Sequence, residues 1–241
     1  IISERAHPKM GTQNFIRRFG QKHLYKLADK IVLQTNDVKQ FYTKKIQEKC
    51  VIIPNPINES LPDRFIGERK KVICAAGRLT IQKNFSMLID AFSKFQKGHN
   101  DYNLIIYGDG PEREKLEKQI NELELNEKVQ LPGYIENVNE KMIDCAMYIS
   151  SSNFEGISNS MLEALAMGIP TICTDCPVGG ASLAMKDKNN GILIPVGDEK
   201  ALVEAMIKIA ENDQLAENYS KEAIKIKEEF SMNKVGKMWT D

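Results

Sequence analysis

From residue 71 onward, short apolar runs alternate with longer segments in which apolar residues recur every three to four positions. These are the side-chain periods of buried strands and amphipathic helices. The predicted strands lie at 71–79, 102–110, 128–134, 147–153, 169–177 and 191–198. The predicted helices lie at 85–98, 111–125, 137–146, directly behind Glu155, 199–212 and 215–230. The alternation predicts right-handed βαβ units and therefore an α/β fold with a doubly wound parallel sheet.

The first 65 residues repeat only part of this rhythm. The pattern predicts a basic amphipathic helix at 15–30, a strand at 31–35, a helix at 37–45 and a strand at 50–57. Such a piece is too small for a core of its own, and a linker is predicted at 55–70.

The chain opens on Ile-Ile-Ser, typical of the end of a buried strand, without an initiator Met or a signal-peptide layout. We therefore expect the sequence to begin partway through a longer protein. Residues 1–65 would be the last part of one α/β domain with its linker, and residues 66–241 a second α/β domain.

Composition narrows the functional classes. Lys and Arg together number 33 and so do Asp and Glu, so the net charge is zero and gives no support for nucleic-acid binding. No apolar run reaches the length of about 18 residues that a membrane span needs. Five scattered cysteines indicate a reducing compartment rather than a disulfide framework, so a cytoplasmic location is expected.

The cysteines and histidines do not predict a metal site. Cys173 and Cys176 form a C-x-x-C, but no second pair of cysteines or histidines accompanies it. Their segment instead resembles a buried strand that leaves the sheet. The three histidines are isolated in the sequence, and we expect no metal and no cofactor.

The loop after the first long strand carries glycine and two cations. Gly77 allows the backbone to approach a ligand, and Arg78 and Lys83 follow within a few residues. Arg grips two oxygens as a fork and Lys acts as a point charge, which suits a diphosphate. An ordinary pair of solvated surface cations is an equally good interpretation of the spacing alone.

The stretch 153–168, NFEGISNSMLEALAMG, places Glu155 before a predicted helix and Glu163 inside it. Gly156, Ile157, Ser158, Asn159 and Ser160 would present backbone N–H groups at the helix N-terminus, where anions bind. Alternatively, Ser160 and Glu163 form a capping box and serve only helix stability.

Carboxylates that flank an anion site would repel the anion, so they are better suited to accept hydrogen bonds from hydroxyl groups. Hydroxyl-rich groups on both sides of a diphosphate describe a nucleotide-sugar. Gly108 and Gly110 follow the second long strand, but Arg113 stands where a dinucleotide fingerprint needs its last glycine. These glycines are expected to keep the loop small beneath a ligand; alternatively, they simply turn the chain.

With these residues assembled, the chain resembles the nucleotide-binding half of a family 4 retaining glycosyltransferase of the GT-B fold, whose domains are Rossmann-like. The motifs are AGRLTIQKN, YGDGPER, VQLPGY, FEGISNSMLEALAMGIPTICTD and GILIPVGD, in that order, and they cover roughly residues 71–230.

The resemblance implies a role for each site residue. Arg78 and Lys83 would hold the diphosphate and take the place of a metal ion. Glu155 would bind hydroxyls of the donor sugar, and Glu163 the ribose hydroxyls. The backbone from Gly156 to Ser160 would contact the phosphates, and Tyr134 and Ile135 would lie near the base.

The resemblance also implies a metal-independent hexosyltransferase. It would move a hexose or N-acetylhexosamine, with UDP favoured as the nucleotide, to a glycan or lipid-linked acceptor in bacterial surface polysaccharide or lipopolysaccharide synthesis. The alternatives are a non-catalytic nucleotide-binding module and a nucleotide-sugar epimerase of the same fold. A glycosidase is rejected because one Glu lies in the helix behind a phosphate-type loop, not across a cleft.

Two departures from the family's pattern matter. Leu183 stands where the family often has Glu after a Gly pair, which leaves the donor identity open, while Gly179 and Gly180 are expected as loop contacts. The resemblance also implies that the given sequence lacks most of the acceptor domain, with its glycine-rich loop and active-site histidine. The chain alone is therefore expected to bind nucleotide but to transfer poorly.

The basic helix at 15–30 offers a second surface. Arg17, Arg18, Lys22, His23, Lys26 and Lys30 interleave with apolar residues, so the helix could lean on an anionic membrane. The competing interpretation, a solvated helix whose apolar face packs on its own domain, is the favoured one.

Overall fold

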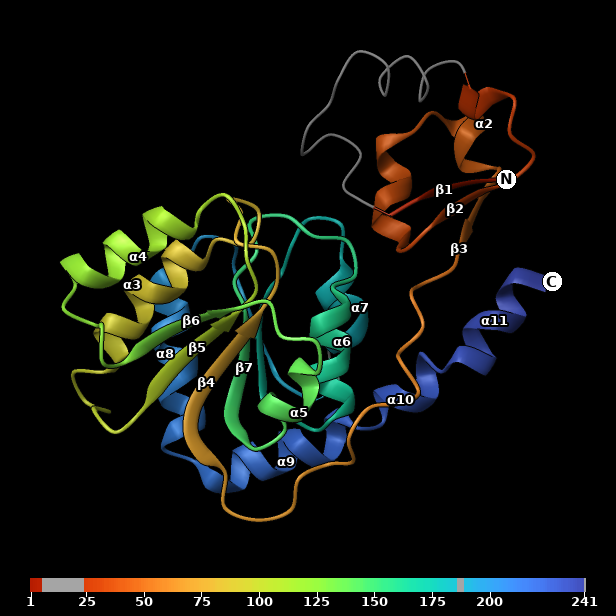
Figure 1. Ribbon diagram of the computed structural model, residues 1–241. Helices are drawn as coiled ribbons and strands as arrows, with labels where there is room; N and C mark the ends of the chain where they lie inside the picture. Colours follow the sequence, from red (N-terminus) through yellow and green to blue (C-terminus); the bar gives the residue numbers. More distant parts are fainter. Residues whose placement is uncertain (6–23, 186–188, 241) are drawn as a thin grey trace.

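The computed structural model describes residues 1–5, 24–185 and 189–240. Its larger sheet has six strands in the order β6-β5-β4-β7-β8-β9 (Figure 1). The strands are β4 Lys70–Ala76, β5 Asn103–Tyr107, β6 Val129–Gly133, β7 Cys145–Ser150, β8 Thr171–Thr174 and β9 Ile192–Ile194. All neighbours pair in parallel, which confirms the predicted doubly wound sheet. The order reverses between β4 and β7, and ligand crevices form at such a switch point.

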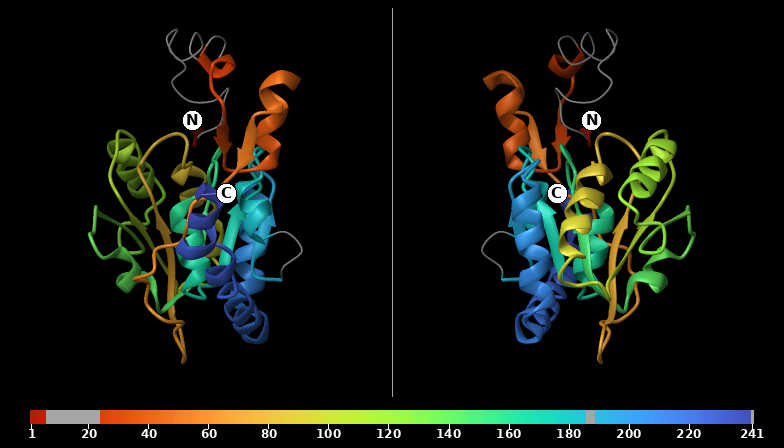
Figure 2. Two further views of the ribbon diagram at one scale, coloured as in Figure 1. Left: turned by 90° about the vertical axis from the view of Figure 1, so that its right-hand side faces the viewer. Right: turned by 90° about the vertical axis from the view of Figure 1, so that its left-hand side faces the viewer.

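Helices cover both faces of this sheet (Figure 2). They are α3 Phe85–Phe95, α4 Arg113–Glu122, α5 Val138–Met142, α6 Asn159–Ala166, α7 Gly180–Met185, α8 Glu199–Ala210, α9 Asp213–Ala223 and α10 Ile226–Glu229. One core lies under α3, α4 and α8, where Leu88 and Phe92 are fully buried. A second core lies under α5, α6 and α7, around Tyr148 and Leu165. We call the sheet with these helices the large unit.

The second sheet has three parallel strands in the order β1-β2-β3, namely β1 Ile2–Glu4, β2 Ile31–Leu33 and β3 Cys50–Ile52. With the short helices η1 Leu24–Lys26, η2 Asn36–Phe41 and α2 Lys44–Gln47 it forms the small unit. The single helix predicted at 37–45 is wrong, because Tyr42 and Thr43 are extended and separate η2, a 3-10 helix, from α2.

The predicted basic helix falls mostly on residues 6–23, which lie outside the described part of the chain. Of its remainder, Tyr25 and Ala28 are buried against the small sheet, whereas Leu27 is 80% exposed. Among the described residues, no helix combines the length and the apolar character that crossing a bilayer requires.

The end of the chain differs from its prediction. The one helix expected at 215–230 is divided into α9 and α10, and a further helix, α11 Met232–Thr240, follows. Val235 of α11 packs against Val32 and Ile53 of the small unit. The Ile57 N–H donates to the Phe230 carbonyl at 2.8 Å. The chain therefore passes between the units twice, at 53–69 and again at 230–232, while the predicted boundary after residue 65 stays a prediction.

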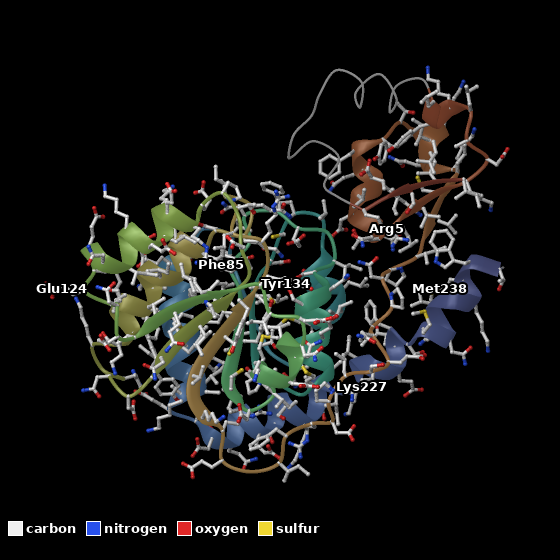
Figure 3. All side chains as sticks on the ribbon, in the orientation of Figure 1. Arg5, Phe85, Glu124, Tyr134, Lys227 and Met238 are labelled. Carbon is white, nitrogen blue, oxygen red and sulfur yellow. The ribbon has the colours of Figure 1, made fainter. Side chains whose placement is uncertain are left out.

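Several polar contacts join the small unit to the carboxyl edge of the large sheet. Gln34 Oε1 accepts from the Ile157 N–H at 3.1 Å, and Asn55 Nδ2 donates to Asn159 Oδ1 at 2.7 Å. Arg5 Nη1 in turn donates to Asn55 Oδ1 at 2.6 Å, and Figure 3 shows Arg5 on the side of the small unit that faces the large one. The small unit thus sits directly over the loops predicted to carry the site.

Candidate functional site

The predicted site loops follow β4 and β7 and meet at the switch point. The Asn153 N–H donates to the Gln82 carbonyl at 2.8 Å, and Ser151 Oγ donates to the Lys83 carbonyl at 2.9 Å. Asn84 Nδ2 donates to Asn153 Oδ1 at 2.9 Å. Because these bonds join the two loops, residues about 70 positions apart in the sequence form one surface.

Lys83 and Glu155 form an ion pair on this surface. Lys83 Nζ lies 2.6 Å from Glu155 Oε2, and the two side chains are only 17% and 22% exposed. Gln82 Nε2 donates to the other carboxylate oxygen at 3.1 Å. A Cβ on Gly77 would lie 3.0 Å from Lys83 Cε, so the glycine leaves room for the lysine side chain. The structure brings the predicted cation and the predicted sugar-binding acid together.

A cavity of about 420 Å³ lies next to Gly77, the glycine that the Lys83 side chain approaches. It is lined by Ala76, Gly77, Arg78, Tyr107, Gly108, Asp109, Tyr134, Ile135 and Val138. All the residues predicted for the base, together with Gly77, Gly108 and the exposed Arg78, therefore share one cavity. Tyr134 is 79% exposed and stands at the carboxyl edge of the sheet (Figure 3). A ring in this position suits stacking on a flat heterocycle.

Gly108 has a definite role in shaping this cavity. Its φ is +130°, and a methyl group added there would overlap the Gly77 carbonyl oxygen. Its N–H donates to the Gly133 carbonyl at 2.8 Å, while the Gly77 N–H donates to the Tyr107 carbonyl at 2.9 Å. The loops after β4, β5 and β6 can approach so closely only because no side chain separates Gly108 from Gly77.

The N-terminus of α6 is arranged differently from the capping-box alternative, which is wrong. The N-cap is Ser158, without a side-chain capping bond, and Ser160 already lies inside the helix. The Ser160 hydroxyl accepts from Tyr148 at 2.8 Å and donates to the Ala76 carbonyl at 3.3 Å. Ser160 is therefore used to join α6 to β4 and β7, and Glu163 does not reach back to the helix start.

The backbone N–H groups predicted to bind phosphate are not all equally available. Within the described part of the chain, no acceptor is found for those of Ser158, Asn159 and Ser160, as is normal for the first turn of a helix. The Ile157 N–H, in contrast, is bonded to Gln34 from the small unit. A ligand at this helix start would meet the free amides first.

Glu163 lies on α6 against the short helix α5. Asn139 Nδ2 donates to Glu163 Oε2 at 3.3 Å. Burial raises the pKa of Glu163, and the Asn139 hydrogen bond partly offsets that shift. Glu163 is half-buried. Its partner Asn139 directly follows Val138, which lines the cavity.

A second cleft, of about 480 Å³, lies between the two units. Its lining residues are Thr35, Asn36, Asp37, Asp175, Cys176, Pro177, Gly179, Ser182 and Leu183. Leu183 is 38% exposed here. Gly179 lies in this lining as a loop residue, but Gly180 begins α7, so its prediction as a loop contact is corrected. A methyl group on Gly180 would overlap the Gly156 carbonyl oxygen, so this glycine lets α7 pack on the Glu155 loop.

The C-x-x-C behaves as predicted for a buried strand end. Cys173 lies in β8, Cys176 follows it, and both thiols are free and buried. Burial raises the pKa of both, which keeps them protonated.

Four site residues were not found from the sequence: Gln34, Asn55, Gln82 and Asn139. Gln82 precedes Lys83, and its position in a cationic loop was a usable signal. Asn139 stands on a short polar helix without any motif. Gln34 and Asn55 act across the contact between the units, and local periodicity carries no information about such contacts.

The family described as glycosyl transferases group 1 matches residues 57–226. An uncharacterized glycosyltransferase of Methanocaldococcus jannaschii is 29% identical, over 96% of this chain and 67% of its own length. The N-acetylgalactosamine-N,N'-diacetylbacillosaminyl-diphospho-undecaprenol 4-alpha-N-acetylgalactosaminyltransferase of Campylobacter jejuni is 30% identical, over 92% of this chain and 63% of its own length.

Among solved structures, a mutant of Staphylococcus aureus TarM in complex with fondaparinux, alpha-GlcNAc-glycerol and UDP superposes with a TM-score of 0.88 at 20% identity. The match covers 99% of this chain and 49% of that one, so this chain spans half to two thirds of the length of its relatives. The predicted GT-B type fold is confirmed. Because the family match extends over most of the sequence, the chain belongs to the glycosyl transferases group 1.

Proposed function

We propose that this chain is the donor-binding half of a retaining glycosyltransferase. The donor would be a nucleotide diphosphate sugar, with UDP favoured, and a hexose or N-acetylhexosamine would be transferred to a glycan or lipid-linked acceptor. The acceptor class is supported by the Campylobacter relative, which acts on a diphospho-undecaprenol compound. The nucleotide is supported by the TarM structure, which contains UDP.

The observation that carries the proposal is the meeting of three features at one switch point. Lys83 and Arg78 come from the loop after β4, and the free amides of α6 follow the loop after β7. The 420 Å³ cavity is lined by Arg78 and by Ala76, whose carbonyl accepts from Ser160 of α6. Cationic side chains and the backbone N–H groups of a helix N-terminus both attract the negative charge of a diphosphate. A cavity edged by an exposed tyrosine then takes the base.

In the proposed reaction, the bond between the sugar C1 and the diphosphate oxygen breaks, and the oxygen leaves with the electron pair. The acceptor hydroxyl forms the new bond to C1 on the same face, and its proton passes to the departing phosphate. Arg78, Lys83 and the α6 amides stabilise the charge that grows on the leaving group. Glu155 would hold the sugar by its hydroxyl groups.

Arg78 and Lys83 would supply the positive charge that a metal ion provides in other transferases, so we propose a metal-independent enzyme. Transfer by the full-length protein is then expected to continue in excess EDTA. A loss of activity in EDTA that Mg²⁺ or Mn²⁺ restores would contradict this part of the proposal.

Titration calorimetry of the chain with UDP and GDP tests the proposal directly. Binding of at least one of them is expected, with loss of binding in Arg78→Ala. If neither nucleotide binds, the assignment of a donor site is overturned. If a nucleotide binds but the full-length protein never consumes a nucleotide-sugar, a non-catalytic nucleotide-binding module takes its place.

A further inference from the structure

Asn139 on α5 is the one described side chain that donates a hydrogen bond to the Glu163 carboxylate. It belongs to a helix of five residues, and the cavity residues Tyr134, Ile135 and Val138 directly precede it. The residue thus connects the wall of the cavity to an acid on the neighbouring helix.

The direction of this hydrogen bond is fixed by its surroundings. Asn139 Oδ1 is buried and has no partner among the described residues. If the amide were turned over, this oxygen would face the Glu163 carboxylate, and two acceptors would repel each other. The amide nitrogen therefore points to the carboxylate, although the arrangement leaves the amide oxygen without a hydrogen bond.

A buried acceptor without a partner costs free energy. An apolar residue of the same size would avoid that cost, but it would remove the donor that serves the half-buried Glu163 carboxylate. Asn139 directs one oxygen of the half-buried Glu163 carboxylate, and the described residues donate no hydrogen bond to the other oxygen. Together the two residues form an acceptor of fixed orientation.

We propose that Asn139 is a positioning residue that holds Glu163 in the orientation needed to accept hydrogen bonds from the ribose hydroxyls of the nucleotide. The proposal rests on the proposed function, because it assigns the ribose to Glu163. It adds a residue that touches no substrate atom and acts through the acid beside it. Functional side chains keep such orientations only when their neighbours lock them.

The inference is tested by binding of two ligands that differ only at the ribose. Calorimetry of the chain is done with UDP and with 2′,3′-dideoxyuridine diphosphate, and with the guanosine pair in parallel. Wild-type chain is expected to bind the ribonucleotide more tightly. Asn139→Leu, which keeps the volume but has no donor, and Asn139→Ala are expected to weaken UDP binding about 5- to 10-fold. Their affinity for the dideoxy nucleotide is expected to change less than about twofold.

Asn137→Ala is the matched control. Asn137 is an exposed asparagine two residues earlier, at the N-cap of the same helix, and its side chain makes no capping bond. Both affinities are expected to stay at the wild-type value in this variant. Glu163→Gln is the positive control and is expected to lose the preference for the ribonucleotide.

The outcomes separate the inference from the function on which it rests. If both Asn139 variants weaken the two nucleotides equally, Asn139 merely supports the wall of the cavity and the inference is overturned. Unchanged UDP affinity overturns it as well. If wild-type chain binds neither ribonucleotide, the proposed function itself fails, and the role of Asn139 fails with it.

Discussion

Glu155 and Glu163 lie eight positions apart, and the structure treats them in opposite ways. Glu155 is held in a loop by Lys83 and Gln82, so its charge is compensated before any ligand arrives. Glu163 lies in a helix, half-buried, with one amide donor, and burial raises its pKa. One glutamate is thus paired with a cation, whereas the other has an amide donor and no cationic partner among the described residues. Spacing alone does not distinguish these two situations.

The largest expected effect is the loss of transfer activity when Lys83, the cationic partner of Glu155, is removed. Lys83→Ala in the full-length protein should lower the rate of transfer about 10²- to 10³-fold, because a preorganised positive charge near the leaving group is lost. Steady-state kinetics measures this, and circular dichroism checks that the fold is kept. Lys97→Ala, an exposed lysine just after α3, is the control. Near-normal turnover of Lys83→Ala would remove the proposed mechanism.

An effect of intermediate size, on UDP affinity, is expected to differ between substitutions of Glu155 and Glu163. Glu155→Gln frees Lys83 from its ion pair, so UDP binding is expected to be unchanged or up to about threefold tighter, while transfer falls at least tenfold. Glu163→Gln is expected to weaken UDP binding about tenfold. Calorimetry on both variants measures the contrast. If the two substitutions changed UDP affinity alike, the two acids would not have the separate roles described here.

The smallest effect is on stability. Because burial raises the pKa of Glu163, the folded chain holds a proton that the unfolded chain releases near its ordinary pKa of about 4.3. Stability therefore falls as the pH rises from there through the raised pKa, and it stays lower above it. Glu163→Gln lacks this penalty, so its Tm at pH 7 should exceed that of wild type, by less than about 4 °C.

Thermal unfolding followed between pH 4 and pH 7 checks this prediction. The difference in Tm between Glu163→Gln and wild type is expected to shrink toward pH 4, where the carboxyl group is protonated in the folded chain and in most of the unfolded chains. A difference that is constant with pH would show that the substitution acts through packing and not through ionisation.

The sequence predicted those features that depend on neighbours along the chain. The strand-helix rhythm of the large unit depends on local hydrophobic periods, and all six of its predicted strands were found. That Gly77, Gly108 and Tyr134 would lie together could also be predicted, because residues at the carboxyl ends of parallel strands gather at one edge of the sheet.

The sequence did not predict those features that depend on the contact between the units. Helix α11 was not predicted, and its Val235 is buried because Val32 and Ile53 cover it. The bond from Ile157 to Gln34 joins residues 123 positions apart. The Ser160 capping box satisfied a local rule, but Tyr148 and Ala76 bind that hydroxyl instead.

Because α11 packs against the small unit, it determines where a recombinant fragment of this protein should end. A recombinant fragment that starts at residue 66 would keep α11 but strip Val235 of its cover, leaving an apolar stripe that invites aggregation. Trp239 would lose Arg5, whose guanidinium carbon lies 5.6 Å from its ring centre. A nucleotide-binding fragment for crystallisation or screening should therefore stop at Phe230, where the large unit has its last fully buried side chain.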